Sequence, residues 1–549
     1  MKTYVVLLAG LISWSWAATA QLLPVTLVHQ FTTPALARAP FKLGPDGNFY
    51  SVTTIGGSGR GSVFRLSSNG VFTTLALFTA THGQNPSDPL VLGADGQWYG
   101  TTPQGGTHSR GTIFRVAFDG RLTTLAHFTD TNGAFPRGLT PLGNGDFIGA
   151  TVTGANYFGT IYRFSAGGGI TTLVNIPASF DSFPGRLTPG PDGHFYGLTY
   201  NGNHGRGKIF RVTLDGVLTQ LASVTGNDYG DSTYLTLGPD GNFYGTTFGG
   251  GAFGRGAAFR VTLDGVLTSL ADFNGANGTS PNSGLTLGAD GNFYGATIHG
   301  GVSGDGTIFK LTPSGALTML AEFTSRPLTG IGPYGGVAFG TDGSLYGPVT
   351  VGGPSDLGAI FRIDLPPSLR EPLANRTNLT GTTVTFAVSA FGTTPLSYQW
   401  WKDQTPLVDG GNISGASTPA LTLANVQIAD SGEYSLVISN RAGTLRTGAR
   451  LTVVAFLDID NDGVPDGQDQ CPGTAPGEVV DHRGCSVSDY VPCAGPAGGG
   501  TWRSHGQYIG AVTAVADAFL DAGLMTEEER DSMVAEAVHS DCGKRRTGR

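Results

Sequence analysis

Cysteine is scarce in this chain, and long apolar stretches are scarcer still. Four cysteines occur in 549 residues, and none stands where a lipid would be attached behind the N-terminal apolar stretch. That stretch, residues 5–16, follows Lys2 and precedes the small residues 18–20, which is the pattern of a cleaved secretory signal over residues 1–20. No second apolar stretch is long enough to cross a bilayer, so we expect no transmembrane span in the mature chain.

Charged side chains and catalytic signatures are also sparse. Asp, Glu, Lys and Arg make up 13% of the residues, and the net charge is −9. That balance disfavours nucleic acid and anionic lipid as partners, because both are bound by basic surfaces. The patterns G-x-S-x-G and H-E-x-x-H and a Walker loop are missing, which disfavours an enzyme. Glycine, in contrast, fills 88 positions, as is typical of a β protein rich in turns.

A turn followed by an aromatic strand occurs seven times in the first two-thirds of the chain. The intervals between successive copies are 49, 49, 48, 48, 50 and 52 residues. Asp-Gly or Asn-Gly between alternating apolar residues is a strong hairpin signal, because glycine accepts the positive φ of a tight turn. The seven turns are Asp46-Gly47, Asp95-Gly96, Asn144-Gly145, Asp192-Gly193, Asp240-Gly241, Asp290-Gly291 and Asp342-Gly343.

Each unit reads as four short strands, and a unit of this length must stack on its neighbours to bury an apolar face. The period fits a blade of a β-propeller, and a β-helix is the second choice. The fourth strand is missing after the seventh unit, whereas a stray copy, residues 25–31, precedes the first. We expect this stray strand to join the sheet that contains Phe361 and to close a seven-bladed β-propeller over residues 21–364.

The recurring D-G-x-x-Y-G-T-T and G-T-x-F patterns resemble the tandem repeat of Gloeobacter and Verrucomicrobia proteins, over roughly residues 24–363. This resemblance implies a bacterial protein that is secreted or held at the cell surface, and it implies no assigned chemistry.

The repeat pattern ends at Pro366-Pro367. Residues 384–388, 396–400, 421–423 and 430–434 resemble strands B, C, E and F of an immunoglobulin-like domain, with Trp400 in strand C and Tyr434 at the tyrosine corner. Val388 and Leu436 occupy the two positions of the usual inter-sheet disulfide. The resemblance implies a β-sandwich over residues 366–455 that is held by packing alone and acts as a spacer.

An acidic loop, residues 458–469, comes next. Carboxylates stand at loop positions 1, 3, 5, 9 and 12 and glycine at position 6, a spacing that wraps oxygen ligands around Ca²⁺. No helix precedes the loop, which disfavours a calmodulin-like switch. An acidic, solvated linker is the alternative. The expected Ca²⁺ ligands are Asp458, Asp460, Asp462, Val464, Asp466 and Asp469.

The cysteines follow this loop. With Cys471 and Cys485, residues 456–487 resemble a thrombospondin type 3 repeat. Export favours oxidation, and three pairings are possible. We favour Cys471–Cys485, which closes a short loop, and with it Cys493–Cys542. Zinc binding is the alternative, although the sequence lacks the paired C-x-x-C of a structural zinc site.

Residues 488–549 are expected to form a small C-terminal domain, in which 502–540 is the only stretch with helical spacing. Gly523 ends the first helix, and Thr526 with Glu529 forms a capping box for the second. A helical hairpin closed by a disulfide follows from this pattern.

Ligand recognition is expected at the end of the propeller where the loops are long, namely the loops between second and third strands and those leading into the next blade. His204 and His299 lie in such loops and are the best candidates for catalytic residues among the histidines. Four arginines in the second-to-third-strand loops either meet an acidic polysaccharide or are ordinary solvated charges. They are Arg60, Arg110, Arg206 and Arg255.

The mainly β chain therefore leads to two functional hypotheses. The first is a secreted or cell-surface binding or adhesion protein with a monomeric recognition head for an extracellular glycan or protein. The second is a polysaccharide-active enzyme, a glycosidase or lyase, that uses the same long loops. A glycosidase needs two carboxylates that converge from different loops, which a sequence cannot show.

Overall fold

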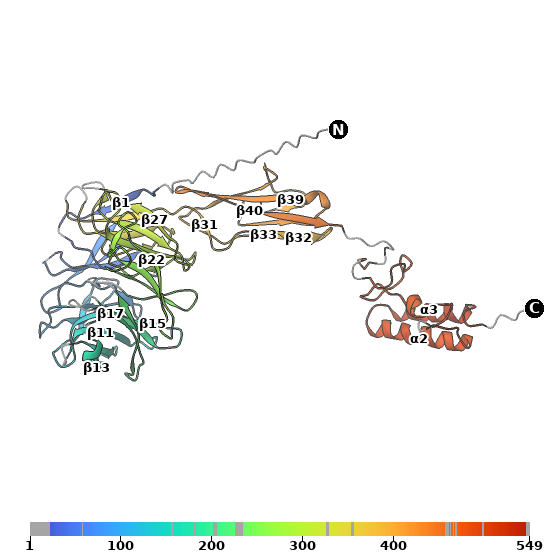
Figure 1. Cartoon of the computed structure of the whole chain (residues 1–549), viewed down its shortest axis with the longest axis horizontal. Coiled ribbons are helices and arrows are strands. Elements are labelled where there is room, and N and C mark those ends of the chain that lie inside the picture. The colour runs from blue at the N-terminus through green and yellow to red at the C-terminus, as the bar shows by residue number, and fades with distance from the viewer. Residues whose placement is uncertain are drawn as a thin grey trace, which may run out of the picture.

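The computed structural model describes residues 22–33, 35–57, 59–154, 158–167, 169–180, 183–200, 206–225, 234–324, 329–352, 356–455, 461, 463–464, 466, 469–496 and 499–544. The predicted secretory signal lies outside these residues. The chain is mainly β, and three parts follow one another along its long axis (Figure 1): a repeat region, an immunoglobulin-like domain and a helical C-terminal module.

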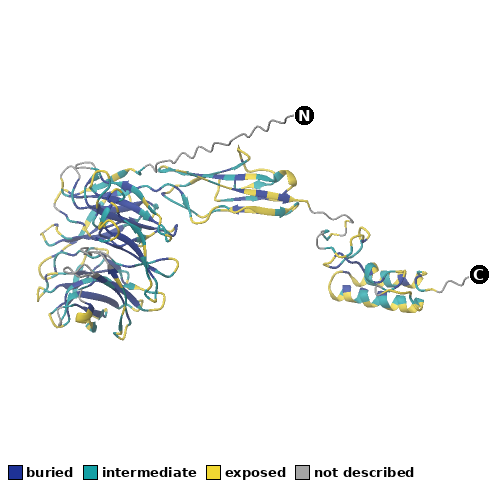
Figure 2. Ribbon diagram, viewed as in Figure 1, coloured by how far each residue is buried: buried dark blue, intermediate teal, exposed yellow. Residues whose placement is uncertain are grey.

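Among the described residues, the repeat region contains seven antiparallel sheets, which we number in chain order. Six of them are built from strands adjacent in sequence, and the seventh combines three such strands with the first strand of the chain. Buried residues follow the middle strands, and exposed residues lie mostly on the connecting loops (Figure 2). Sheets 1 to 3 consist of β2 (Lys42–Leu43), β3 (Phe49–Thr53), β4 (Ser62–Leu66) and β5 (Phe72–Leu77); β6 (Val91–Leu92), β7 (Trp98–Thr102), β8 (Thr112–Val116) and β9 (Leu122–His127); and β10 (Ala134–Pro141), β11 (Phe147–Thr153), β12 (Thr160–Phe164) and β13 (Ile170–Asn175).

Sheets 4 to 7 repeat this plan, with the inner strand split in two in sheets 4 and 6. They consist of β14 (Phe183–Pro184), β15 (Thr188–Pro189), β16 (Phe195–Tyr200), β17 (Arg206–Val212) and β18 (Leu218–Thr225); β19 (Thr236–Leu237), β20 (Phe243–Thr247), β21 (Ala257–Val261) and β22 (Leu267–Asp272); β23 (Thr279–Pro281), β24 (Thr286–Leu287), β25 (Phe293–His299), β26 (Thr307–Leu311) and β27 (Leu317–Glu322); and β28 (Ala338–Phe339), β29 (Leu345–Val349), β30 (Ala359–Ile363) and β1 (Val25–Gln30).

The recurring Asp-Gly turn is fixed by its own aspartate and by the tyrosine four residues later. In sheet 1, Asp46 accepts hydrogen bonds from the backbone N–H of Asn48 (3.2 Å) and from the hydroxyl of Tyr50 (2.8 Å), while Gly47 supplies a φ of 75°. Burial alone would raise the pKa of Asp46, but these hydrogen bonds outweigh it and hold the pKa below its usual value. The same tyrosine–aspartate bond recurs in Tyr99–Asp95, Tyr196–Asp192, Tyr244–Asp240, Tyr294–Asp290 and Tyr346–Asp342.

Neighbouring sheets are joined by aromatic contacts from the same two positions. Successive strand residues point to opposite faces of a sheet, so the tyrosine of one sheet meets the aromatic ring that the next sheet presents. The ring centroids of Tyr244 and Phe293, for example, lie 4.2 Å apart. Equivalent pairs are Tyr50–Trp98, Tyr99–Phe147 and Tyr196–Phe243.

The first strand of the chain belongs to the last sheet. β1 pairs antiparallel with β30, and Leu27 lies opposite Phe361. The predicted pairing of residues 25–31 with the Phe361 strand is therefore confirmed. Phe31 then donates its N–H to the carbonyl of Gly358 (3.1 Å), the bond that Phe78 makes to Gly61 within sheet 1.

Sheets 1 and 7 also contact each other directly. The rings of Tyr346 and Phe49 are 4.8 Å apart, which is the same contact that joins the four tyrosine–aromatic pairs of neighbouring sheets above. Phe49 and Tyr346 share one buried apolar cluster with Phe31 and Ile360. The series of sheet-to-sheet contacts thus returns from the seventh sheet to the first.

A glycine in front of each third strand allows the next sheet to approach. Gly256 has φ +103°, and a β-carbon on it would lie 2.5 Å from the carbonyl oxygen of Thr247 and 2.7 Å from Cδ of Pro281, which enters sheet 6. Gly61 with Pro86, Gly111 with Pro136 and Gly159 with Pro184 repeat the arrangement. The contact requires glycine both for its φ and for the space.

The immunoglobulin-like domain packs two main sheets around one core. Trp400 is fully buried and Tyr434 donates its hydroxyl to the carbonyl of Asp430 (2.8 Å), which confirms the expected core tryptophan and tyrosine corner. Leu436 is buried and Val388 packs against the same core without a disulfide. The elements are β31 (Ser368–Leu369), β32 (Arg376–Leu379), β33 (Val384–Ala387), β34 (Ala390–Phe391), β35 (Ser397–Lys402), β36 (Thr405–Pro406), β37 (Ile413–Ser414), β38 (Ala420–Leu423), β39 (Gly432–Asn440) and β40 (Gly443–Val454).

The C-terminal module contains α1 (Val487–Tyr490), α2 (His505–Asp521) and α3 (Glu527–His539). The Thr526–Glu529 capping box is present. Our expectation of helix only within 502–540 was wrong, because Ser486 and Asp489 form a second capping box that starts the single-turn helix α1. Cys471 is joined to Cys485 and Cys493 to Cys542, the pairing favoured from the sequence. In the described part of the chain, no helix combines the length and apolar character needed to cross a bilayer.

The glycine contact between sheets gives a first prediction. Gly256→Ala places a methyl group against Thr247 and Pro281 at a positive φ, and we expect it to destabilise the repeat region by about 3 kcal/mol. Gly254→Ala is the matched control: Gly254 has φ +67° but nothing within 4 Å of its β-carbon position, so it carries only the backbone strain of about 1 kcal/mol. Calorimetry of the two variants measures the difference. Equal losses of stability would show that the approach of sheet 6 does not depend on this glycine.

Candidate functional site

The long loops of the repeat region enclose a cavity of about 570 Å³, which we call the long-loop cavity. Its walls come from second-to-third-strand loops and from segments that lead into inner strands, contributed by sheets 1, 2, 3, 5, 6 and 7. Because antiparallel strands alternate in direction, these two kinds of connection lie at the same end of every sheet. We call this end the long-loop face and the opposite end the short-turn face. The lining residues are Arg38, Thr54, Asn85, Ser87, Pro103, Gln104, Phe135, Arg137, Val152, Phe248, Asn282, Ile298, His299 and Tyr334.

The chemistry of this cavity is cationic and amide-rich. The guanidinium of Arg38 lies over the ring of Tyr334, 5.2 Å from its centroid, which fixes that positive charge at the wall. Asn85 donates to the side-chain oxygen of Gln104 (2.8 Å). No aspartate or glutamate stands among the lining residues that the structure describes. The cavity therefore offers hydrogen-bond donors and positive charge to a ligand.

The predicted loop arginines lie outside the lining of this cavity. Arg60 donates to the side chain of Gln84 (2.5 Å), and Arg110 pairs with Asp130 (2.7 Å). Arg255 lies against Gly275, and the side chain of Arg206 is outside the described part of the structure. Their role in binding a ligand stays a prediction. Of the two histidines, His299 lines the cavity and His204 lies outside the described residues.

Backbone carbonyls give the loop arginines a second, structural role. The carbonyls of Arg60, Arg110 and Arg255 accept the N–H of Asn85, Phe135 and Ser280, which lie in the segments entering the next sheets. The three donor residues, Asn85, Phe135 and Ser280, have φ values of 60°, 58° and 57°. The loops around the cavity are thus tied to one another from sheet to sheet, which fixes the shape of its rim.

The arginines that do line the cavity, Arg38 and Arg137, were not predicted from the sequence. Arg38 precedes the inner strand of sheet 1 and Arg137 lies within the inner strand of sheet 3, at positions where the other repeats carry different residues. A search for repeated charges passes over them. These two arginines could have been identified by the opposite signal, a charged residue at a repeat position that has no consensus residue.

The immunoglobulin-like domain is attached at the short-turn face. Arg370 donates to the carbonyl of Ala289 in the turn of sheet 6 (3.0 Å), and Thr394 donates its N–H to the carbonyl of Asp342 in the turn of sheet 7 (2.8 Å). A β-carbon on Gly343 would lie 2.4 Å from the carbonyl oxygen of Gly392, so backbone meets backbone here. The long-loop cavity consequently lies at the end of the sheets opposite to this junction.

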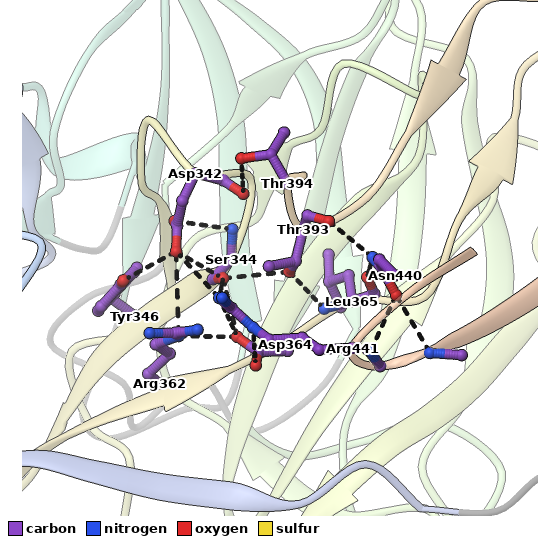
Figure 3. A network of polar contacts seen from close by, with 12 residues as sticks. Asp342, Ser344, Tyr346, Arg362, Asp364, Leu365, Thr393, Thr394, Asn440 and Arg441 are labelled. Atoms are coloured by element: carbon purple, nitrogen blue, oxygen red, sulfur yellow. Dashed lines mark hydrogen bonds and ion pairs between the residues drawn. The ribbon is translucent and has the colours of Figure 1, made fainter. Parts of the chain in front are cut away.

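A polar network fixes the junction (Figure 3). Arg441, in the turn between β39 and β40, donates from Nε and Nη2 to the two carboxylate oxygens of Asp364. Asp364 also accepts from Arg362 (2.7 Å) and Ser344 (3.0 Å) of sheet 7. Nη2 of Arg441 lies 3.4 Å from Oδ2 of Asp342. The repeated turn aspartate of sheet 7 thus serves both its own turn and the neighbouring domain.

Asn440 adds neutral hydrogen bonds to this network. Its side-chain amide donates to the carbonyls of Leu365 (2.8 Å) and Thr393 (2.7 Å), and Thr393 in turn accepts the N–H of Leu365 through its hydroxyl (2.8 Å). These bonds brace the short connection between the two domains on both sides (Figure 3).

The predicted calcium loop lies partly outside the described residues, because Asp458, Asp460 and Asp462 are not among them. Gly463 has φ +97°, the sharp turn expected at loop position 6. Asp469 accepts the N–H of Cys471 through Oδ1 (2.7 Å), and its Oδ2 is buried without a hydrogen-bond partner in the described structure. Where side chains are described, no group of three or more His, Cys, Asp or Glu could hold a metal ion.

Comparison with known families agrees with the repeat pattern. The model of the Gloeobacter/Verrucomicrobia repeat matches residues 20–204 and 183–394, more than half of the chain. The chain belongs to this family. A model of the immunoglobulin I-set domain matches residues 367–453, which overlaps the end of the repeat match. The resemblances to this repeat and to an immunoglobulin-like domain are thereby confirmed, whereas the resemblance to a thrombospondin type 3 repeat stays a prediction.

Three similar proteins each match less than a fifth of this chain. "Leucine-rich repeats and immunoglobulin-like domains protein 3" of Homo sapiens is 34% identical over 96 residues, 17% of this chain and 9% of that protein. "Vascular endothelial growth factor receptor kdr-like" of Danio rerio is 33% identical over 88 residues, 16% of this chain and 7% of that protein. The chain thus spans less than a tenth of either relative. The crystal structure of titin domain M3 shares 32% identity and covers 16% of this chain and 97% of its own, with a TM-score of 0.15.

The junction network gives a second prediction. Arg441→Met removes the bonds to Asp364 but keeps the aliphatic stem, and we expect the docked arrangement to lose about 1 kcal/mol, since the pair is partly exposed. Small-angle scattering should show a wider range of interdomain distances, and protease cleavage near residues 364–368 should rise several-fold. Arg450→Met, which removes only an exposed arginine 3.8 Å from Glu433, is the matched control and should leave both readouts unchanged. If Arg441→Met behaves like this control, the network does not hold the junction.

Proposed function

We propose that this protein is an exported, multidomain binding protein whose recognition site is the long-loop cavity. The observation that carries the proposal is the position of that cavity, at the end of the sheets opposite to the immunoglobulin-like domain. A ligand can therefore reach the cavity while the rest of the chain extends away from it. The secretory pattern of residues 1–20 and the two disulfides support a location outside the cytoplasm, either secreted or at the bacterial cell surface.

The repeat region is proposed to be a seven-bladed β-propeller. The support comes from the Tyr346–Phe49 contact and from β1, which supplies the fourth strand of sheet 7 and so leaves no open edge between the last sheet and the first. Within such a propeller the long-loop cavity is the mouth of the central channel, and the immunoglobulin-like domain is a spacer on the other face.

An anionic ligand, such as an acidic glycan, fits the cavity best. Arg38, Arg137 and His299 are lining residues, and the described lining contains no aspartate or glutamate. The same observation disfavours a glycosidase, which needs two converging carboxylates. Binding without turnover is therefore the proposed activity. Names such as growth factor receptor among the matched proteins are consistent with a binding role for the chain.

The ligand proposal predicts a specific pattern on an array of acidic and neutral glycans. The full chain should retain acidic glycans without cleaving them, and the double variant Arg38→Met/Arg137→Met should bind at least about tenfold more weakly, because each charged hydrogen bond contributes about 1.5–3 kcal/mol. Arg121→Met, an exposed turn arginine outside the cavity lining, is the matched control and should bind like the unaltered protein. Arg110→Met tests the loop arginines separately. Cleavage of a retained glycan would favour the enzyme instead, and undiminished binding by the double variant would remove the cavity from the proposal.

The acidic loop is proposed to bind Ca²⁺ and to stiffen the linker between the immunoglobulin-like domain and the C-terminal module. The buried, unpartnered Oδ2 of Asp469 and the positive φ of Gly463 fit the end and the turn of such a loop. Asp458, Asp460, Asp462, Asp466 and Asp469 would supply carboxylates, and Val464 a backbone carbonyl. The proposed likeness to a thrombospondin type 3 repeat depends on this metal and on the Cys471–Cys485 bridge.

Removal of calcium should expose this linker. EDTA should increase protease cleavage between residues 456 and 471 several-fold, because five carboxylates without a cation repel one another. Asp466→Asn/Asp469→Asn should be cleaved in calcium as readily as the unaltered chain in EDTA, and Asp521→Asn, at an exposed helix position, should not. Cleavage that is the same with and without calcium would identify the loop as an ordinary acidic linker.

A further inference from the structure

A second cavity lies among the inner strands of the repeat region, towards the short-turn face. It has a volume of about 380 Å³ and is lined by residues of sheets 1, 3, 4, 5 and 6. We call it the inner cavity. None of its lining residues lines the long-loop cavity. Lys42 and Arg186 bring two positive charges into it, and the described lining holds no carboxylate.

The hydroxyl groups of the inner cavity are already engaged. Thr140, Thr188, Thr236 and Thr286 occupy equivalent positions in sheets 3 to 6, and each donates its hydroxyl proton to a carbonyl of the next sheet at 2.6–2.7 Å. These bonds join neighbouring inner strands. Lys42 stands at the same position in sheet 1, where it replaces the threonine. The donors left for a ligand are therefore the two cations and the phenol of Tyr234.

Arg186 is held in the cavity by its neighbours. A β-carbon on Gly138 would lie 3.0 Å from Cγ of Arg186, so this glycine makes room for the side chain. The guanidinium carbon lies 4.9 Å from the centroid of the Tyr234 ring. Nε and Nη1 of Arg186 are buried and have no hydrogen-bond partner among the described residues. Buried charged donors without an acceptor are costly, so such a site calls for one.

Lys42 is the second cation of the inner cavity. Burial and the positive charge of Arg186 lower the pKa of Lys42 to about 8, so that two cations oppose each other at neutral pH. Two like charges in one cavity destabilise the fold unless a counter-charge lies between them. The volume of the inner cavity is ample for a small oxyanion.

We propose that the inner cavity binds a small inorganic oxyanion, such as phosphate or sulfate, between Lys42 and Arg186. The anion accepts from Nε and Nη1 of Arg186 and from the ammonium of Lys42, and it thereby links sheet 1 to sheet 4 through charge. This site is independent of the proposed glycan site, since it uses other residues and a different cavity. Its role is to stabilise the arrangement of the sheets.

Inorganic phosphate is the probe that tests the site on the full chain. At constant ionic strength, phosphate replacing chloride should raise the unfolding temperature of the repeat region in a saturable way, as expected for a ligand that binds only the folded state. Isothermal titration calorimetry should give a single binding event. Lys42→Met/Arg186→Met should abolish both effects.

The variants distinguish a binding site from a general salt effect. Lys42→Met/Arg186→Met should unfold in phosphate-free buffer at the same temperature as the unaltered chain or higher, because it removes the opposed charges. Arg121→Met, which makes the same change at an exposed turn, should keep the full response to phosphate. An unsaturable rise that is equal in all three proteins is the effect of an excluded salt and would overturn the proposal. The absence of any rise in the unaltered chain would overturn it as well.

The response should also depend on pH. The charged or titratable side chains in the described lining of the inner cavity are Lys42, Arg186 and Tyr234. Above pH 8 Lys42 loses its proton while Arg186 stays charged, so sulfate, whose own charge is constant over this range, should bind about tenfold more weakly at pH 9.5 than at pH 7. Equal affinity at the two pH values would exclude Lys42 from the site.

Discussion

The contact between the tyrosine of one sheet and the aromatic ring of the next is the interaction on which the repeat region depends. A four-stranded sheet of this size has two faces, and neither is covered by a helix in the described part of the region. Each face can be buried only by another sheet, and the tyrosine and its preceding aromatic residue supply one ring to each face. Such a pair contributes about 0.5–1.5 kcal/mol beyond the area that it buries. The turn with its aromatic strand repeats because every sheet must bury both of its faces against neighbouring sheets.

The aspartate of the repeated Asp-Gly turn stabilises its own turn and also orients the ring that packs against the next sheet. In six sheets its carboxylate closes the turn and accepts the tyrosine hydroxyl, so the ring that packs between sheets is oriented by the turn that precedes it. In sheet 3 the turn begins with Asn144 and an isoleucine replaces the tyrosine. There Arg163 pairs with Asp146, two residues after the asparagine. In sheet 7 the turn aspartate, Asp342, also meets Arg441. The turn aspartate of sheet 7 thus also contacts the immunoglobulin-like domain, while the sequence of the turn stays that of the repeat.

Much of this architecture could be predicted because it follows from local chemistry. Asp-Gly turns, alternating strands and the orphan strand 25–31 carry their own signals, and the β1–β30 pairing and both disulfides agree with them. The single-turn helix α1 could not be predicted, since four residues are too few for a helical period. The loop arginines were conspicuous because they repeat, yet Arg110 is paired with Asp130 of its own unit. The lining of the long-loop cavity converges from loops far apart in sequence, which no local pattern encodes.

Repetition itself explains where the functional positions lie. A residue that recurs in every unit answers a need that every unit has, which is to fold and to contact its neighbours. A ligand on or near the centre of the repeat region breaks that equivalence, because each unit presents a different loop to it. Lys42 among the inner threonines, Arg186 and Tyr234 beside the glycines Gly138 and Gly284, and Arg38 stacked on Tyr334 are all departures from the repeat. They gather in two cavities rather than over the outer surface, and a stable scaffold would retain such unpaired charge there only if another group compensates it.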